Sequence, residues 1–237
     1  MILSRDDIDS RADAILRDFG GKSPLDVFSL ASDYLGLELR SLWLSDEGSI
    51  LGITTYTEVD VRISSWGYGQ IAHFTASTLA IDSRLYNAAR REYKERGRLR
   101  FTIAHECAHQ ILFRMEPDAR QSSLRRLDDR PYSARELKSR DDWSEWQANA
   151  LAAALLMPSA AVRKIQRLPL TRYGRRINRP DDLALYRLMS EFGVSRAAML
   201  IRLRELGLLE ERPAAEYYDP TEIWNYEADE VNDAAPA

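Results

Sequence analysis

The chain has 237 residues, of which 45% are hydrophobic and 30% charged, with a formal net charge of -4 and one cysteine. This composition excludes a generally disordered protein and an internal disulfide, and no apolar run approaches the about 20 residues that a membrane-spanning helix needs. The N-terminus turns acidic before a signal-peptide stretch is formed, so we expect a cytoplasmic protein without a membrane partner. The charge is uneven: residues 210–237 hold nine acidic residues and one arginine, which is -8, and the rest of the chain carries +4.

The N-terminal part of the sequence predicts two helices. Apolar residues recur with the 3.6-residue period of an amphipathic helix over residues 8–19, and the glycine pair that follows ends this helix. For the second helix we expect Ser23 as the N-cap and Pro24 in the first helical position. Its buried face is expected to include Phe28, and Gly36 ends it.

Short strands are predicted next. Segments 37–44 and 50–56 are rich in aliphatic, aromatic and threonine residues and flank a turn, which predicts a hairpin. Residues 57–77 alternate polar and apolar around a glycine break, so we expect another strand or hairpin there, and a further strand over 78–82. Charged residues dominate 87–100, where we expect a solvated helix, with a nucleic-acid surface as the alternative.

The second half of the chain is predicted to be helical. A polar stretch over 116–142 is too charged to be core, and we expect a solvated loop there, with a substrate-contacting lid as the alternative. This stretch separates the two helices that are expected to carry a site, and three more helices follow. The five expected helices cover residues 101–113, 143–157, 159–167, 181–192 and 195–206.

A metal-binding pattern lies in the first of these helices. Residues 105–109 read His-Glu-Cys-Ala-His, the H-E-x-x-H pattern of zinc peptidases. His105 and His109 are separated by a helical rise of about 6 Å and face the same way, so both imidazoles can reach one tetrahedral zinc ion. Glu106 is not a ligand; we expect it to take the proton of a water whose pKa zinc lowers toward ~7. Two ordinary surface histidines are the alternative interpretation.

Zinc then needs a third protein ligand from another segment. No further histidine follows the pattern, and the remaining one, His73, lies upstream in strand-like sequence. Glu145 heads a nearly unbroken apolar helix, where a carboxylate is costly unless it is paired, so we expect Glu145 to be the third ligand. Asp141 and Asp142 are expected to be charges at the N-terminus of that helix. The predicted ion is Zn²⁺, with Mn²⁺ as the alternative.

The segments around these residues resemble one protein family. Residues 100–109, Arg-Phe-Thr-Ile-Ala-His-Glu-Cys-Ala-His, and residues 145–158, which begin Glu-Trp-Gln-Ala-Asn and end Leu-Leu-Met-Pro, are similar to the ImmA/IrrE zinc metallopeptidases. The likeness extends over roughly residues 23–209. Carried over by position, it implies two zinc-binding histidines, a catalytic base and a third ligand, which are His105, His109, Glu106 and Glu145.

The resemblance implies an α+β fold with a zincin-like (gluzincin) core: a small antiparallel or mixed sheet, an active-site helix and a C-terminal helical annex with the outline of a helix-turn-helix. It also implies a zinc endopeptidase that cleaves an Xre-type helix-turn-helix repressor and relieves repression of stress or mobile-element genes. The expected divisions are a metallopeptidase domain over 1–158, the annex over 159–209 and an acidic tail over 210–237. A non-proteolytic, zinc-stabilised regulator that binds a repressor or DNA is the alternative.

Cys107 and Asn149 are expected to lie close to the metal ligands. Cys107 departs from the leucine that is usual at this place in the family, and it lies about 200° round the helix from His105. We therefore expect it to face the core, with an extra metal ligand or a redox brake as alternatives. Asn149 follows Glu145 by one turn, so we expect it to hydrogen-bond a metal ligand or to pin nearby backbone.

The residue that stabilises an oxyanion is not identified by the sequence. The candidates are His73, Tyr132, Tyr173 and Arg175.

The C-terminal segments carry two possible interaction features. Arg196, Arg202 and Arg204 on the last predicted helix suit phosphate contacts, but the same helix has an apolar face, so we expect protein docking or packing there rather than direct DNA binding. The acidic tail is interrupted by four aromatic residues, which is typical of an interaction segment. We expect the tail to compete with an acidic partner surface or to cover the basic segment 125–130.

Overall fold

The computed structural model describes residues 3–46, 48–65, 68–115, 140–166 and 183–208. The chain divides into two compact units, Met1–Pro158 and Ser159–Ala237. The predicted polar stretch before residue 140 and the acidic tail lie outside the described residues, apart from Arg140–Asp142 at the start of a helix. None of the helices in the described ranges is long and apolar enough to cross a membrane.

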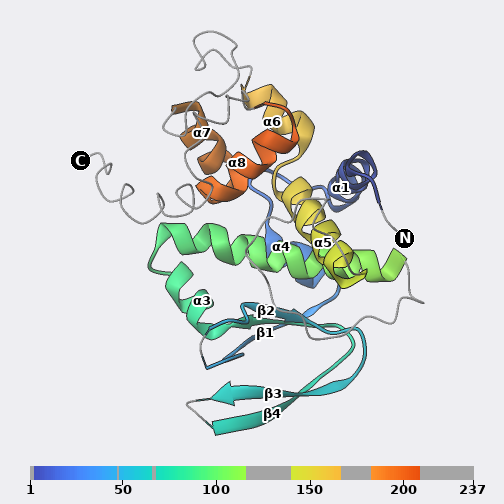
Figure 1. Cartoon of the computed structure of the whole chain (residues 1–237), viewed down its shortest axis with the longest axis vertical. Helices are drawn as coiled ribbons and strands as arrows, with labels where there is room; N and C mark the ends of the chain where they lie inside the picture. Colours follow the sequence, from blue (N-terminus) through green and yellow to red (C-terminus); the bar gives the residue numbers. More distant parts are fainter. Residues whose placement is uncertain (1–2, 47, 66–67, 116–139, 167–182, 209–237) are drawn as a thin grey trace. The chain divides into compact units, whose positions relative to one another are not determined.

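The elements of the first unit, in chain order, are α1 (Arg5–Phe19), α2 (Val27–Ser29), the π-helical η1 (Leu30–Tyr34), β1 (Glu38–Leu42), β2 (Gly52–Thr54), β3 (Val59–Ser65), β4 (Tyr68–Phe74), β5 (Thr78–Asp82), α3 (Ser83–Ala89), α4 (Tyr93–Met115) and α5 (Arg140–Leu156). In this unit, α1, α4 and α5 lie on one side of the short strands (Figure 1).

The first helix begins and ends with clear local signals. Ser4 is the N-cap of α1: its hydroxyl accepts a hydrogen bond from the Asp7 amide, and the Asp7 carboxylate accepts one from the Ser4 amide. These two bonds form a capping box, which satisfies backbone donors that a helix start leaves open. Gly20 ends the helix with φ 68°, a left-handed conformation that glycine adopts without steric cost. The predicted helix over 8–19 is confirmed.

The predicted second helix starts later than its sequence indicates. Its N-cap is Asp26, whose carboxylate accepts hydrogen bonds from the amides of Phe28 and Ser29, so Ser23 and Pro24 precede the helix. The Asp26 carboxylate accepts hydrogen bonds from two backbone amides and so provides the N-terminal cap that was predicted to be Ser23. The helix then widens into the π-turn of η1, and Phe28 is 39% exposed rather than part of a buried face.

The three-stranded sheet has the order β1-β5-β2, so the hairpin predicted for residues 37–56 is wrong. β5 lies between the two expected hairpin strands, parallel to β1 and antiparallel to β2. β1 remains at least partly accessible at every residue, which fits an edge strand, whereas all five residues of β5 are buried, which fits the central position. β2 is also buried, but it has only three residues and forms a short edge beside β5.

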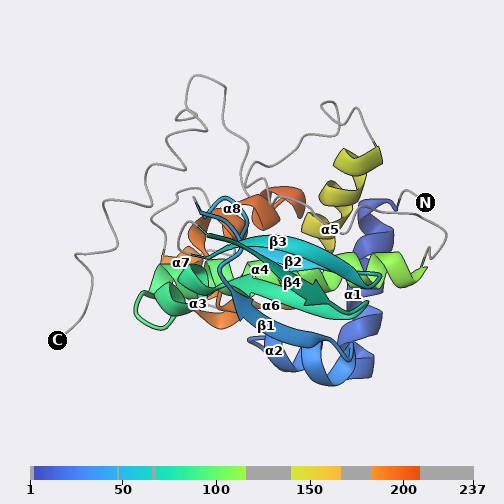
Figure 2. The ribbon, with the colours of Figure 1, turned by 90° about the horizontal axis from the view of Figure 1, so that it is seen from below.

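A separate antiparallel hairpin of β3 and β4 confirms the strand or hairpin that was predicted over 57–77. In Figure 1 the hairpin lies below the three-stranded sheet, on the side away from α4, and in Figure 2, which is seen from below, it overlaps the sheet. Apolar residues from the hairpin, including Val61 and Phe74, form one buried cluster with Ile53 of β2 and Ala80 of β5. The hairpin therefore covers one face of the sheet.

Helix α4 covers the opposite face of the sheet. Gln110 of α4 donates from Nε2 to the hydroxyl of Thr54 and to the carbonyl of Thr55, at 2.8 Å each. Successive residues of a strand point to opposite faces, so Gly52 and Thr54 face α4 while Ile53 faces the hairpin. Helix α5 packs on α4 and α1, which holds it next to the middle of α4.

The charged segment 87–100 forms the end of α3 and the start of α4. Many of its side chains are exposed, including those of Arg90, Arg91, Lys94, Arg96 and Arg98, as expected for a solvated helix.

The described part of the second unit, residues 159–166 and 183–208, forms the short helices α6 (Ser159–Gln166), α7 (Leu183–Phe192) and α8 (Arg196–Glu205). Ser195 caps α8 by accepting from the Ala198 amide, and Gly193 turns the chain with φ 61°. Arg202 is buried and lies 3.7 Å from the Glu205 carboxylate, which agrees with the packing expected for this helix rather than with direct DNA binding. Its packing within the helical unit accounts for a basic residue at this position.

Candidate metal centre

The central part of α4 is enclosed on every side. All residues from Thr102 to Ile111 are buried, because this stretch lies between the sheet and α5. His105 is 1% exposed and His109 is 2% exposed, so the alternative of two ordinary surface histidines is wrong. Two buried imidazoles on one helix face need polar partners in the same region.

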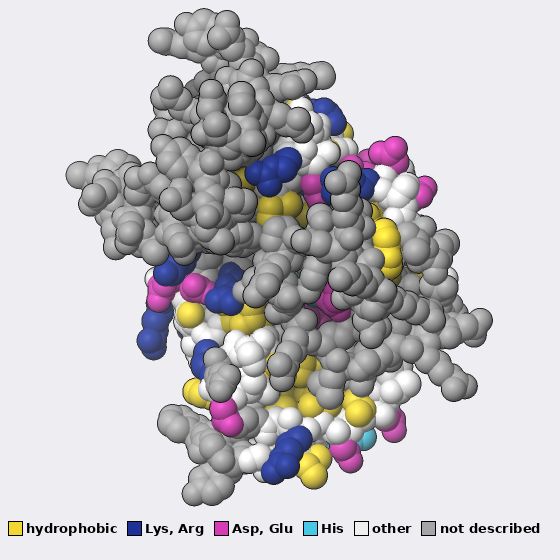
Figure 3. All heavy atoms as spheres, viewed as in Figure 1, with side chains coloured by type: hydrophobic (Ala, Val, Ile, Leu, Met, Phe, Trp, Pro, Cys, Tyr) yellow, Lys and Arg dark blue, Asp and Glu magenta, His cyan; other side chains and the backbone are white. Residues whose placement is uncertain are grey.

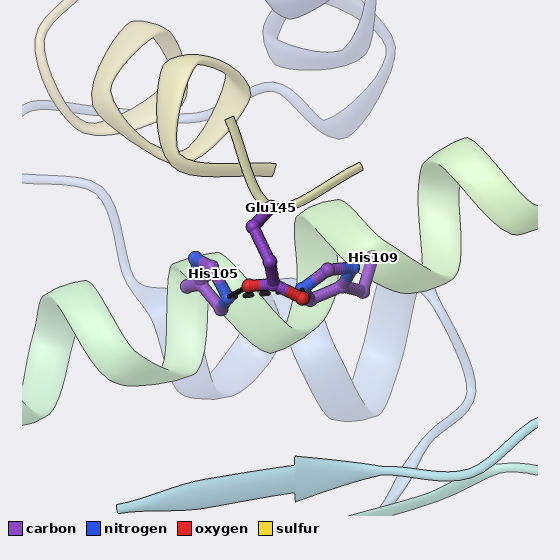
Figure 4. A group of neighbouring side chains, drawn as sticks. All are labelled: His105, His109 and Glu145. Atoms are coloured by element: carbon purple, nitrogen blue, oxygen red, sulfur yellow. Dashed lines mark hydrogen bonds and ion pairs between the residues drawn. The ribbon is translucent and has the colours of Figure 1, made fainter. Parts of the chain in front are cut away.

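Glu145 of α5 lies between the two histidines (Figure 4). Its Oε2 is 3.3 Å from Nε2 of His105, and its Oε1 is 3.3 Å from Nε2 of His109. The two Nε2 atoms are 2.9 Å apart. One ligand atom from each of the three residues thus lies within 4.8 Å of the others, from helices that are far apart in the sequence.

These separations fit a zinc ion. Ligands at about 2.0–2.1 Å in a tetrahedron lie roughly 3.3–3.4 Å from one another. Both histidine–carboxylate distances have this value, and the two histidine nitrogens are closer by about 0.4 Å. The donor set of two imidazoles and one carboxylate is also that of catalytic zinc sites, which keep a fourth position open.

The charges of the site favour a cation. Burial alone would raise the pKa of Glu145, but hydrogen bonds from His105 and His109 outweigh it and hold that pKa well below its usual range. Burial would lower the pKa of His105, yet the hydrogen bond to Glu145, the Glu106 charge and Asn149 raise it above its ordinary value. An ionised Glu145 carboxylate beside the two imidazoles suits a bound cation.

Asn149 orients one of the ligands. Its Oδ1 lies 2.9 Å from Nδ1 of His105, which confirms that Asn149 hydrogen-bonds a predicted ligand. An amide oxygen only accepts, so Nδ1 carries the proton and Nε2 presents its lone pair to the metal position. Asn149 lies one helical turn beyond Glu145 on α5, so one helix face supplies both the carboxylate and this support.

The side chain of Glu106, which belongs to α4, is buried against β2. It is 4% exposed and is not a member of the His105–His109–Glu145 group. A Cβ atom at Gly52 would lie 2.9 Å from Oε1 of Glu106, which is closer than real Cβ contacts allow. Gly52 thus provides the space for the Glu106 carboxylate. The sequence analysis missed this residue, although a glycine inside a strand often marks such a close approach.

Cys107 faces the core, as predicted. Its side chain is fully buried, burial raises the pKa of its thiol, and it does not belong to the group of metal-ligating side chains. A buried thiol that stays protonated behaves as a small apolar residue.

The oxyanion candidates are not placed at the metal group. His73 lies on β4, where its Nδ1 is 2.9 Å from Oδ1 of Asp60, and both side chains are largely exposed. It is absent from the metal-ligating group among the described residues. Tyr132, Tyr173 and Arg175 lie outside the described residues.

A mixed α+β fold with two buried histidines and a partly buried glutamate that converge from two helices defines the class of zinc-metallopeptidase-like domains. Residues 89–204 match the family model of the IrrE N-terminal-like domain, Peptidase_M78, and this segment contains all four predicted site residues. This segment of the chain therefore belongs to the ImmA/IrrE family, and the resemblance seen in the sequence is confirmed there. The match begins at residue 89, so it does not include residues 23–88, which the resemblance in the sequence also covered. No curated protein gives a significant match to the chain.

Proposed function

We propose that this protein is a zinc-dependent endopeptidase, with His105, His109 and Glu145 as metal ligands and Glu106 as the general base. The observation that carries the proposal is the convergence of two Nε2 atoms and one carboxylate at tetrahedral ligand spacing, with a second buried carboxylate on the same helix. A structural zinc site would not require that second carboxylate. Mn²⁺ is the alternative ion.

When bound, the metal supplies Lewis acidity, which activates water and polarises the scissile carbonyl. The chain's own contribution is proton transfer. Glu106 accepts a proton from the attacking water and then donates it to the nitrogen of the leaving amine, so the carboxylate returns to its starting state. The contact with β2 confines the Glu106 side chain, and Asn149 fixes the tautomer of His105.

The proposed substrate is an Xre-type helix-turn-helix repressor, whose cleavage relieves repression of stress or mobile-element genes in the cytoplasm. Membership of a peptidase family supports a protein substrate, and the repressor class rests on the family resemblance. The proposed organisation is a metallopeptidase domain over 1–158, a helix-turn-helix-like annex over 159–209 and an acidic tail over 210–237.

The test is incubation of the metal-loaded protein with the repressor that is encoded beside it, together with a metal assay. Glu106→Gln should keep one metal ion per chain and lose cleavage by about 10²- to 10⁴-fold, because only proton transfer is removed. Glu145→Ala and His105→Ala should lose the metal. A Glu106→Gln protein that still cleaves would overturn the mechanism.

The second candidate is a non-proteolytic regulator that keeps zinc for stability and acts by binding. The closely paired His-His-Glu group supports this candidate, since such a group also links α4 to α5 without any reaction. A wild-type protein that leaves the repressor uncut but binds it or DNA stably would establish this function.

A further inference from the structure

Gln110 is a buried polar side chain that directly follows the predicted ligand His109 on α4. Figure 3 shows Lys, Arg, Asp and Glu side chains scattered over one face of the described residues, where water can hydrogen-bond them, whereas Gln110 is only 3% exposed. A buried amide needs hydrogen-bond partners inside the protein. Gln110 is not one of the metal-ligating side chains, so the ligand set does not account for a glutamine at this position.

The amide of Gln110 joins α4 to the end of β2. Its Nε2 donates to Oγ1 of Thr54 and to the carbonyl oxygen of Thr55, at 2.8 Å each. A carbonyl oxygen only accepts, so the nitrogen of the amide must face the strand, and these bonds use both of its N–H groups. The Thr54 hydroxyl donates in turn to the carbonyl of Thr78 in β5, at 3.4 Å. Gln110 thus connects α4 with two strands of the sheet.

β2 depends on such a connection because it is very short. It has three residues and pairs with β5 alone among the described strands. A ladder of three residues contains few hydrogen bonds that can hold its register. Successive residues of a strand point to opposite faces, so a shift by one residue would bring a side chain to the place that Gly52 now occupies.

Two contacts set the position of β2 along α4. Gly52 faces Glu106, and Thr54 faces Gln110. Four residues of a helix rise about 6 Å and two residues of a strand extend about 6.4–6.8 Å, so the two contacts have nearly the same spacing on both elements. The strand and the helix therefore run side by side in the same direction. Without the contact at Gln110, β2 can shift relative to the Glu106 carboxylate.

We propose that Gln110 is a positioning residue for Glu106: it holds β2 in register with α4, so that Gly52 stays opposite the carboxylate. The proposal rests on the proposed function, in which Glu106 is the general base. Both N–H groups of the Gln110 amide are bound to the strand, so this residue acts through β2 and Glu106.

The ¹³Cδ resonance of Glu106 tests the positioning without metal or substrate. In the metal-free full chain, labelled at the side-chain carboxyl of glutamate, this resonance is identified by its absence from Glu106→Gln. Gln110→Met has an unbranched side chain that cannot donate, and it should move the resonance, as Gly52→Ala does. Thr54→Val removes one of the two acceptors and should move it less. Ser4→Ala, which weakens the fold at the start of α1, is the control for lost stability and should leave it in place.

Cleavage of the repressor by the metal-loaded protein measures the consequence for the reaction. Gln110→Met should keep the metal content and the KM within about twofold and lower kcat about tenfold, because only the geometry of the base changes. The double variant of Gln110→Met and Gly52→Ala should lie within about twofold of Gly52→Ala alone, because both changes displace the same carboxylate.

A Gln110→Met protein whose Glu106 resonance and kcat match the wild type would overturn the proposal. Loss of the metal from this variant, effects that multiply in the double variant, or an equal movement of the resonance in Ser4→Ala would also overturn it. If Gln110→Met does not fold, Thr54→Val decides, and an unmoved resonance in that variant counts against the proposal. A wild type that cleaves nothing, with a resonance that still moves in Gln110→Met, would leave the positioning intact and contradict the peptidase function.

Discussion

Gly52 and Glu106 are in contact across the boundary between β2 and α4, and the space for the Glu106 carboxylate exists only because residue 52 has no side chain. A Cβ at position 52 would lie 2.9 Å from both Oε1 of Glu106 and Cγ2 of Thr102. The methyl of Thr102 belongs to a stiff, β-branched side chain that gives little, so both the Glu106 side chain and the backbone of β2 would have to shift.

Gly52→Ala should therefore lower kcat by about 10- to 100-fold, because a general base displaced by roughly 1 Å loses its reactive geometry. The metal content should not change, since none of the three ligands contacts this position. Repressor cleavage and metal analysis of the same sample measure the two effects. Ile53→Val, on the opposite face of β2, is the matched control and should leave kcat unchanged. Loss of the metal from Gly52→Ala would contradict this account.

Asn149→Ala should weaken metal binding by about 10- to 100-fold, because His105 loses the acceptor that fixes its tautomer. Competition with a chelator of known affinity measures the change. Asn149→Asp keeps an oxygen acceptor for Nδ1 and should retain most of the affinity. Equal affinities for the wild type and for Asn149→Ala would show that the contact does not orient the ligand.

Cys107→Ala should keep both the metal and the activity within about twofold, and should reduce the free energy of unfolding by about 1 kcal/mol through the small cavity that it leaves. A maleimide should modify Cys107 only in urea, since the thiol is fully buried in the folded chain. Loss of the metal in the variant, or rapid labelling under native conditions, would revive the alternatives of an extra ligand or a redox brake.

The capping box of α1 predicts a pH dependence. The side-chain and backbone hydrogen bonds with Ser4 lower the pKa of Asp7, so its contribution to stability is present above the unfolded pKa of about 3.9 and is lost as pH falls through the folded value. Asp7→Asn should thus be less stable than the wild type at pH 7, and the difference should shrink below about pH 4. Urea unfolding at several pH values measures it, and a difference that does not shrink as the pH falls below about 4 would contradict the assignment.

The same cap offers a control that does not titrate. Ser4→Ala removes the hydroxyl that accepts the Asp7 amide and should cost about 1 kcal/mol. Part of this loss should persist at every pH, because the hydroxyl itself does not titrate. A loss for Ser4→Ala that vanishes completely at low pH would show that the Asp7 charge alone stabilises this helix start.

The His105–His109–Glu145 group was predictable because helical spacing brings its two histidines to one face of α4 and the position of Glu145 required a partner. His105, Glu106 and His109 lie within five residues, and a carboxylate heading an apolar helix required a partner, which indicated Glu145. The space around Glu106 was not predictable in this way. It depends on a strand that is more than fifty residues away in the sequence and on a sheet order that no local pattern specifies.

Two predictions about the fold were wrong because the local sequence does not decide them. The hairpin expected over 37–56 is not formed, because strand pairing depends on burial across the whole sheet and the faces of β5 are more apolar than those of β1. The second helix was placed too early because Ser23 and Asp26 are both good N-cap residues, and the sequence alone does not decide between them. The helices of the second unit were predicted well, since their caps and periodicity are local.

The position of β5 in the sheet has a consequence for synthesis of the protein on the ribosome. Its residues are made last among the strands, yet both other strands of the sheet pair with it. The backbone groups of β1 and β2 therefore lack their partner in the sheet until residue 82 has left the exit tunnel. The hairpin of β3 and β4, which pairs locally, is complete before that point and is ready to cover the sheet as soon as it closes.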